Sequence, residues 1–279
     1  MGMVPINKII PLSMVDGPGC RTSIFLQGCN IACAYCHNPE TQKLCCHCGI
    51  CVSQCPEGAL SISGGKVVWD ETLCTACDTC INVCPYDASP KIKMMDAKAV
   101  FAKVEESMPF IQGITVSGGE CTLYPDFLLD LFLHTKAEGL TCLIDTNGMI
   151  DLSLYPELME VCDGVMLDVK SWDNTVGKKL TGMATNDMVK KNLKYLADQD
   201  KIEELRIVCL PHEVDAEDVI EGIASTIPDK IQKIKLKLIT FRHYGVKGRL
   251  KETKSPDAAY MEELLNKAVK LGFEKVQVI

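Results

Sequence analysis

The sequence lacks any long hydrophobic run and any leader-like start. No stretch of its 279 residues reaches the ~20 consecutive apolar residues that a membrane-spanning helix needs. The first ten residues, MGMVPINKII, contain one lysine and no long apolar run, which does not match a secretory signal peptide. We therefore expect a cytoplasmic protein that does not associate with membranes.

The sequence also lacks an excess of positive charge. Lys and Arg number 29 against 37 Asp and Glu, which gives a net charge of -8 and a pI of about 5.2. This balance argues against broad binding to nucleic acids or to anionic membranes. The hydrophobic content of 47% is enough for one large core or two, and the charged fraction of 24% makes wholesale disorder unexpected.

What the sequence has in abundance is cysteine, with 17 residues. In a reducing compartment, so many thiols indicate metal ligands rather than disulfides. The segment from Cys29 to Pro56 holds eight of them in two spacings. The first spacing is C-x3-C-x2-C, and the second is C-x2-C-x2-C-x3-C-P.

The second spacing occurs twice. Cys45, Cys48, Cys51, Cys55 and Pro56 recur 29 positions later as Cys74, Cys77, Cys80, Cys84 and Pro85. ALSISGGKVVWDE lies between the copies and predicts a β-hairpin that turns at two glycines. This spacing is typical of bacterial ferredoxins, in which the fourth cysteine ligates the other cluster. It predicts one [4Fe–4S] cluster on Cys45, Cys48, Cys51 and Cys84, and another on Cys74, Cys77, Cys80 and Cys55. A pair of zinc sites is the alternative.

The first spacing supplies Cys29, Cys33 and Cys36, with no obvious fourth ligand. Three thiolates on a four-iron cluster leave one iron open, and an open position is typical of a site that binds a substrate. The alternative is a structural cluster completed by Cys20 or Cys46.

Strands and helices alternate through the rest of the chain. Buried strands are expected at 22–28, 113–117, 141–146, 164–170, 204–210, 233–241 and 275–279, and helices at 127–139, 186–198, 215–226 and 257–271. Six such units predict an α/β fold with parallel strands in an open, partial (β/α)6 barrel. Active-site residues are expected where these strands end.

Polar residues follow several of the predicted strands at that point. The strand endings read SGGE (117–120), DTNG (145–148) and DVK (168–170). Arg206 lies on another strand, and His243 follows the next one. Each pattern alone is a weak signal, and their joint placement at successive strand ends is what indicates a site.

The motifs VDGPG, FLQGC, CAYCHN, SGGE, DTNG and MLDVK together resemble the glycyl-radical-enzyme activating enzymes of the radical S-adenosylmethionine (SAM) superfamily, the family of pyruvate formate-lyase activase. The two-cluster, ferredoxin-like insert makes the chain most similar to the YjjW branch. The resemblance implies a radical SAM core at 1–41 and 91–279, and an insert with two auxiliary clusters at 42–90.

The resemblance also implies a role for individual residues. Cys29, Cys33 and Cys36 would hold the SAM-binding cluster and, with Asp168 and Lys170, would be catalytic. Tyr35, Cys36 and His37 would lie along the adenine, while Gly118, Gly119 and Glu120 would receive the amino group of SAM. Lys170 and His243 would pair with SAM, and Val169 and Arg206 would complete its pocket. Asp145, Thr146, Met166 and Asp168 match positions that can hold a monovalent cation, and Asp16 and Gly17 would face the partner.

The expected activity is reductive cleavage of SAM to methionine and a 5′-deoxyadenosyl radical, which takes a hydrogen atom from a glycine Cα of a partner glycyl radical enzyme under anaerobic conditions. The expected cofactors are three [4Fe–4S] clusters, SAM and the monovalent cation, with flavodoxin or ferredoxin as the reductant. One alternative is a radical SAM enzyme that modifies a small molecule or a peptide. Another is an iron–sulfur electron carrier or redox sensor. Cys20, Cys46, Cys121, Cys142, Cys162 and Cys209 have no assigned role.

Overall fold

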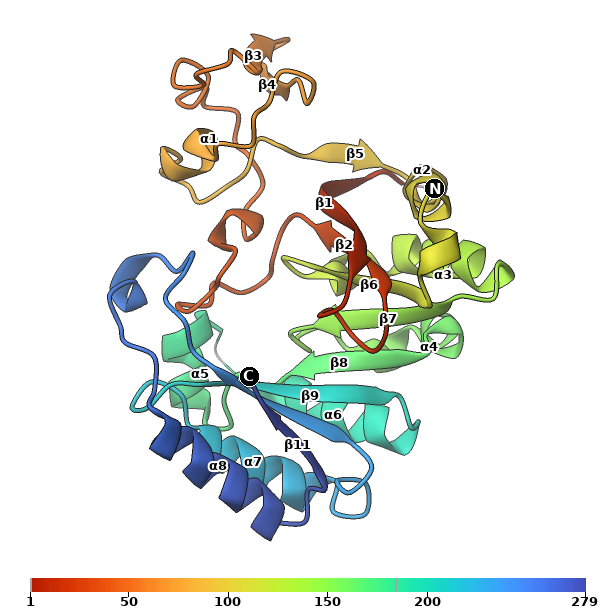
Figure 1. Cartoon of the computed structure of the whole chain (residues 1–279), viewed down its shortest axis with the longest axis vertical. Coiled ribbons are helices and arrows are strands. Elements are labelled where there is room, and N and C mark those ends of the chain that lie inside the picture. Colours follow the sequence, from red (N-terminus) through yellow and green to blue (C-terminus); the bar gives the residue numbers. More distant parts are fainter. Residues whose placement is uncertain (1, 184) are drawn as a thin grey trace.

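A nine-stranded sheet organises most of the chain in the computed structural model, which describes residues 2–183 and 185–279 (Figure 1). In spatial order the strands are β11, β10, β9, β8, β7, β6, β2, β1 and β5. Their bounds are β1 Val4–Ser13, β2 Arg21–Leu26, β5 Lys93–Met95, β6 Gly113–Gly118, β7 Thr141–Thr146, β8 Gly164–Asp168, β9 Ile202–Cys209, β10 Lys235–Thr240 and β11 Lys275–Val278. Neighbours from β2 to β11 are parallel, which confirms the predicted α/β fold.

Two strands at one edge were not expected. β1 pairs antiparallel with β2 on one side and with β5 on the other. β1 contains Pro5 and Pro11, which weaken its strand pattern, and β5 has only three residues.

Helices connect the parallel strands, as the alternation predicts. Their bounds are α1 Thr79–Asn82, α2 Ala97–Glu105, α3 Pro125–Ala137, α4 Pro156–Val161, α5 Asn174–Thr181, α6 Asp187–Asp198, α7 Ala216–Thr226 and α8 Ala258–Lys270. Short 3-10 turns are η1 Pro39–Thr41, η2 Met108–Phe110, η3 Cys121–Leu123, η4 Leu152–Leu154 and η5 Gly248–Leu250. Before α2, α5 and α8, an aspartate side chain accepts a hydrogen bond from the first turn, which stabilises the helix start. No helix in the described part is long and apolar enough to cross a membrane.

The two faces of the parallel sheet differ in chemistry because side chains alternate along a strand. One face is apolar and belongs to the main core, as Val116, Ile144 and Val165 illustrate. The other face, called here the inner face, carries polar side chains near the strand ends. They are Ser117 on β6, Asp145 on β7, Asp168 on β8 and Arg206 on β9, and of these Asp168 lies directly opposite Arg206.

The cysteine-rich segment forms a separate body at one end of the molecule (Figure 1). Its hairpin consists of β3 (Leu60–Ser63) and β4 (Lys66–Trp69). Its small apolar cluster centres on Cys51, Leu60, Val67 and Cys80 and is distinct from the main core. The chain enters and leaves this body side by side, because Lys43 and Ala88 form a parallel bridge.

Candidate functional site

A cavity of about 300 Å³ lies where the parallel strands end. This volume is at the lower end of the range typical of small-molecule sites. Most of the residues predicted for SAM line it, namely Cys29, Cys33, Tyr35, Cys36, His37, Gly118, Gly119, Glu120, Asp145, Thr146, Asp168, Lys170 and Arg206. The structure therefore brings together three cysteines from one loop and polar groups from four successive strand ends.

The loop with the three cysteines, residues 29–38, is fixed by backbone hydrogen bonds at its start and in its middle. The Cys29 N–H donates to the Gln42 carbonyl at 2.8 Å, and the Ala34 N–H donates to the Leu180 carbonyl at 2.7 Å. Burial raises the pKa of Cys29 to about 11 and that of Cys33 to about 12. Neither Cys20 nor Cys46 is among the described residues that line the cavity, so no fourth cysteine completes the set.

Glu120 joins two strand ends beneath the cavity. Its side chain is 1% exposed. One carboxylate oxygen accepts from the Thr122 N–H at 3.0 Å, the Thr122 hydroxyl at 2.6 Å and the Thr146 hydroxyl at 2.8 Å. The other accepts from the Asn147 N–H at 2.7 Å. Burial raises the pKa of Glu120, while these four donors lower it. The carboxylate thus holds the β6 and β7 ends together.

The glycines before Glu120 are required by the backbone around them. A Cβ on Gly118, which has φ +122°, would lie 2.2 Å from the Leu26 nitrogen. A Cβ on Gly119 would lie 2.1 Å from the Gly28 carbonyl oxygen. At both glycines the closely approaching atoms belong to the protein itself, at the end of β2 and just after it.

Asp168 and Lys170 form an ion pair inside the cavity, with 2.9 Å between Nζ and Oδ2. Burial alone would lower the pKa of Lys170, but Asp168 and the nearby Cys33 and Tyr35 raise it well above its usual value. The ammonium lies 5.8 Å from the centroid of the Tyr35 ring. The Tyr35 hydroxyl is buried and has no hydrogen-bond partner within the described residues, which leaves it available to a ligand.

Arg206 connects the inner-face carboxylates. Its guanidinium donates to Asp145 at 2.9 Å and to Glu204 at 2.6 Å, and it contacts the Met166 sulfur at 3.0 Å. Burial would lower its pKa, but Asp145 and Asp168 raise it. The four residues predicted for a monovalent cation are thus already engaged: Asp145 and Met166 with Arg206, Thr146 with Glu120, and Asp168 with Lys170.

Several predicted residues do not line the cavity. The Val169 side chain is buried in the apolar core, because it alternates with inner-face Asp168. His243 is exposed and stacks on Tyr244, with 4.7 Å between ring centroids. Met166 is fully buried behind Arg206.

The residues predicted to face the partner, Asp16 and Gly17, lie before the start of β2 and do not line the cavity. The Asp16 carboxylate accepts hydrogen bonds from the Ser13 and Ser23 hydroxyls at 2.6 and 2.7 Å.

Some residues of the cavity were not predicted individually. Asn147 donates to Asn30 at 2.8 Å and to the Cys29 sulfur at 3.7 Å. Ser117 donates to Asp145 at 3.0 Å. Gln42 also lines the cavity. Ser117 belongs to the SGGE motif and Asn147 to the DTNG motif, so the sequence did carry a signal for both, whereas Gln42 lies in no such motif.

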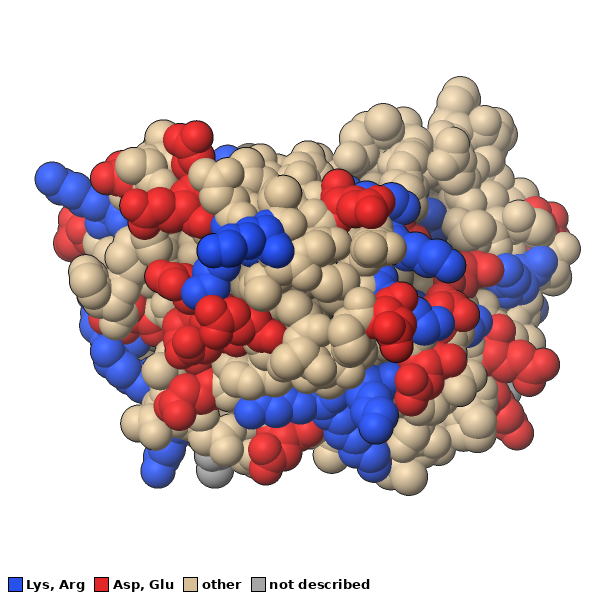
Figure 2. Space-filling view, turned by 90° about the horizontal axis from the view of Figure 1, so that it is seen from below, with Lys and Arg blue, Asp and Glu red and all other residues tan. Residues whose placement is uncertain are grey.

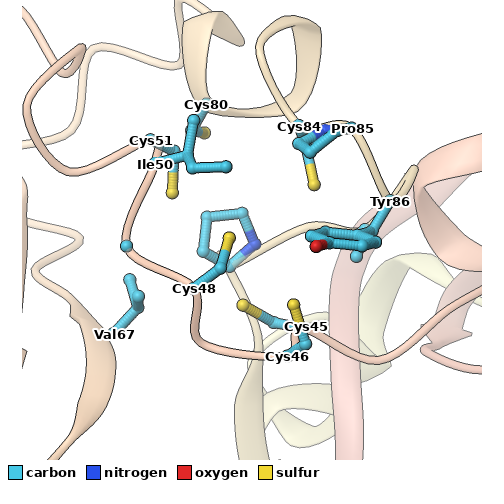
Figure 3. A pocket seen from close by; sticks show the side chains of 13 residues that line it. Cys45, Cys46, Cys48, Ile50, Cys51, Val67, Cys80, Cys84, Pro85 and Tyr86 are labelled. Carbon is cyan, nitrogen blue, oxygen red and sulfur yellow. The ribbon is translucent and has the colours of Figure 1, made fainter.

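The insert cysteines gather around two pockets. The first insert pocket is lined by Cys45, Cys48, Cys51 and Cys84, together with Cys46 and Cys80 (Figure 3). The second insert pocket is lined by Cys55, Cys74, Cys77 and Cys80. Cys84 thus lies with Cys45, Cys48 and Cys51, and Cys55 lies with Cys74 and Cys77, while Cys80 lines both pockets. Within residues 2–183 and 185–279, no three Cys, His, Asp or Glu side chains are close enough to hold a single metal ion.

The remaining cysteines are mostly structural. Cys121, Cys142, Cys162 and Cys209 are buried in the main core. Cys20 is half-buried and packs against the same core. His47, beside the insert cysteines, accepts a hydrogen bond from the Val67 N–H at 3.2 Å and thereby ties its loop to the hairpin.

Comparisons with known proteins identify the family. Residues 23–222 match the family model of the radical SAM superfamily. The (2S)-3-sulfopropanediol sulfolyase activating enzyme of Bilophila wadsworthia is 32% identical over 93% of this chain and 94% of its own. A Haemophilus influenzae protein that carries the name glycyl-radical enzyme activating enzyme is 30% identical over 88% of this chain and 84% of its own.

The solved structures support the fold. The crystal structure of Streptococcus suis SuiB bound to S-adenosylmethionine has a TM-score of 0.56 at 15% identity, over 91% of this chain and 48% of SuiB. Together with the sequence matches, these findings show that the chain belongs to the radical SAM superfamily and, within it, to the glycyl-radical-enzyme activating enzymes.

Proposed function

We propose that this protein activates a glycyl radical enzyme by forming the radical on one glycine of that partner. When bound, a [4Fe–4S] cluster supplies the electron that splits SAM into methionine and a 5′-deoxyadenosyl radical, which takes a hydrogen atom from the glycine Cα. The observation that carries the proposal is the convergence of three cysteines, the Asp168–Lys170 pair and the Glu120 network on one cavity.

The residues present fit a cluster and a nucleotide. Cys29, Cys33 and Cys36 offer three thiols at one cavity, and the buried Tyr35 hydroxyl lacks a partner among the described residues. Lys170 would hold the SAM carboxylate, while Asp168 keeps the ammonium charged and oriented. The carbonyls around Gly118 and Gly119 would accept from the amino group. Tyr35 and His37 would border the adenine, and bound SAM would displace water from the inner face around the reacting atoms.

The cysteine-rich body, residues 42–90, would hold two auxiliary [4Fe–4S] clusters between the two parts of the core, 1–41 and 91–279. The donor chemistry suits iron–sulfur clusters, because each pocket offers four thiols in the crossed pattern. A low-potential flavodoxin or ferredoxin would supply the electrons. Asp16 and Gly17 would meet the partner's glycine loop, and His243 would reach SAM only after its loop moves.

A monovalent cation is the poorest fit among the proposed cofactors. Oxygen donors suit such a hard ion. The Asp145 carboxylate, however, already accepts a hydrogen bond from Arg206. The Thr146 hydroxyl already donates one to Glu120. A bound cation would require Arg206 to turn away from Asp145. If it binds, SAM affinity will depend on potassium or sodium concentration in the wild type.

The proposal is tested by anaerobic reconstitution with iron and sulfide, followed by SAM and dithionite. We expect 5′-deoxyadenosine from the wild type and from Cys20→Ala, and none from Cys33→Ala. Cys20 is the matched control because it is a half-buried cysteine outside the cavity. Equal product from all three proteins would contradict the proposed site.

The partner is tested separately. A candidate glycyl radical enzyme is added to the reconstituted protein, and EPR is recorded. A doublet at the glycine supports activation. Cleavage of SAM without a radical on any candidate favours modification of a small molecule or peptide instead, and no cleavage at all favours an electron carrier.

A further inference from the structure

The first insert pocket contains more cysteines than one four-iron cluster can bind. Six cysteines line it, against four in the second insert pocket, and Cys80 belongs to both lists. With Cys80 assigned to the second pocket, five remain in the first: Cys45, Cys46, Cys48, Cys51 and Cys84. A [4Fe–4S] cluster of the ferredoxin type is held by four thiolates. One of the five thiols is therefore surplus.

Cys46 is the surplus thiol, because it lies outside the repeated spacing. Cys45, Cys48 and Cys51 recur as cysteines 29 positions later, and Cys84 is the fourth cysteine of that second copy. The residue 29 positions after Cys46 is Thr75. The two copies therefore differ in chemistry at this one position beside their first cysteine.

The two copies nevertheless have the same backbone conformation around this position. Two residues in each loop have positive φ, and they correspond across the 29-residue offset: His47 (57°) with Ala76 (56°), and Gly49 (77°) with Asp78 (58°). Because positive φ is uncommon outside glycine, its recurrence indicates that both loops follow the same path. Thr75 lines the second pocket as Cys46 lines the first. The first loop alone thus offers a second thiol at this place.

Cys45 and Cys46 compete for one place in the first insert pocket. They are neighbours in the chain, with Cα atoms about 3.8 Å apart, and Figure 3 shows their sulfurs at the same edge of the pocket. The His47 N–H donates to the Cys45 sulfur at 3.4 Å, and a hydrogen bond of this kind favours a thiolate. Cys46 is exposed, whereas Cys45 is half-buried. These contacts favour Cys45 as the resting ligand.

We propose that Cys46 is an alternative ligand for the iron that Cys45 holds in the first insert pocket. This inference rests on the proposed insert clusters and is independent of SAM cleavage. In the exchange, the bond between iron and the Cys45 sulfur breaks, and a bond to the Cys46 sulfur forms. Cys46 releases its proton to water, the freed Cys45 thiolate takes one up, and no electron moves. The first cluster therefore persists without Cys45, whereas the second does not persist without Cys74.

The experiment compares equivalent variants of the two loops in the full chain after anaerobic reconstitution. Iron and acid-labile sulfide are measured per chain. Cys45→Ala and Cys46→Ala should each keep the wild-type iron content. The double variant Cys45→Ala/Cys46→Ala should lose the iron of one cluster, and so should Cys74→Ala, the matched control in the loop without a spare thiol.

Alkylation with iodoacetamide, read by mass spectrometry, follows the Cys46 thiol directly. In the reconstituted wild type, exposed Cys46 should be modified. In Cys45→Ala its modification should slow several-fold, because its sulfur then binds iron, and removal of iron by a chelator should restore the wild-type rate. In Cys74→Ala, Cys46 should react as it does in the wild type.

A gain of function in the second loop covers the case in which Cys45→Ala disturbs the insert. Adding Thr75→Cys to Cys74→Ala places a thiol at the position that corresponds to Cys46, on the same backbone path. We expect this double variant to recover the iron that Cys74→Ala loses. Adding Thr72→Cys instead, at an exposed position outside the pocket, should recover none.

Two results would overturn the inference. One is an equal loss of iron in Cys45→Ala and Cys74→Ala with no recovery on adding Thr75→Cys. The other is equal alkylation of Cys46 in the wild type and in a Cys45→Ala variant that keeps its iron. A wild type that holds the iron of only one cluster would instead defeat the proposed insert clusters. Full iron content without 5′-deoxyadenosine would defeat only the proposed activity.

Discussion

At the scale of single residues, Glu120 shows how one buried carboxylate can hold a site together. It accepts four hydrogen bonds from Thr122, Thr146 and Asn147. In Glu120→Gln an amide NH2 would face one of these donors, and a buried unsatisfied group costs about 1–3 kcal/mol. Since 1 kcal/mol shifts Tm by roughly 2–4 °C in a domain of similar size, we expect Tm to fall by several degrees. Exposed Glu138→Gln is the control, and an equal Tm for both variants in thermal unfolding would refute the role.

Lys170 is the residue on which SAM binding should depend most. Its ammonium stays charged because Asp168 lies 2.9 Å away and holds its pKa high. We expect Lys170→Met to weaken SAM binding by about tenfold or more, which corresponds to ~1.4 kcal/mol. Isothermal titration of the reconstituted protein measures this. Lys190→Met is the matched control, because Lys190 packs on the Trp172 ring outside the cavity. Equal affinities at equal iron content would remove Lys170 from the site.

At the scale of elements, the parallel strands could be predicted because each is a short apolar run followed by polar residues. β1 could not, since its two prolines interrupt the pattern and its pairing with β5 depends on the distant return of the chain. In the site, too, some positions could be predicted from local sequence and others could not. Asp168 and Lys170 meet as the strand geometry predicts. Gln42 reaches the cavity only through tertiary contacts, and exposed His243 shows that a polar residue after a strand need not face the site.

The insert is the element that should depend most on its metal. Its apolar cluster is small, and two of its central members are Cys51 and Cys80. Without clusters such a body has too little core to fold stably. We therefore expect iron chelation to open residues 45–85 to proteolysis and rapid hydrogen exchange, while β6 to β10 stay protected. Mass spectrometry before and after chelation locates the change. Equal protection of the insert in both states would show that it folds without metal.

At the scale of the whole molecule, charge is distributed without a large area of one sign on the face shown in Figure 2, where Lys and Arg lie among Asp and Glu. On the other side of the molecule, contacts of defined geometry join the insert to the rest of the chain. The insert, the cysteine loop and the loop after β10 meet through Lys43–Ala88, Lys247–Asp87 and Gly245–His37. A change at this junction should affect both the SAM site and the insert.

Gly245 and Gly248 allow that junction to be tested with matched variants. Both have positive φ, +77° and +70°, so alanine brings a similar backbone strain of about 1–2 kcal/mol at each. They differ in surroundings: a Cβ at Gly245 would meet the His37 carbonyl oxygen at 2.2 Å, whereas a Cβ at Gly248 has open space. Gly245→Ala should therefore push the loop from the cysteine loop, weaken SAM binding and speed iron loss on dilution, beyond any effect of Gly248→Ala. If the two variants show the same SAM affinity and the same rate of iron loss, backbone strain alone explains their behaviour, and contact of this loop with the cysteine loop does not support the site.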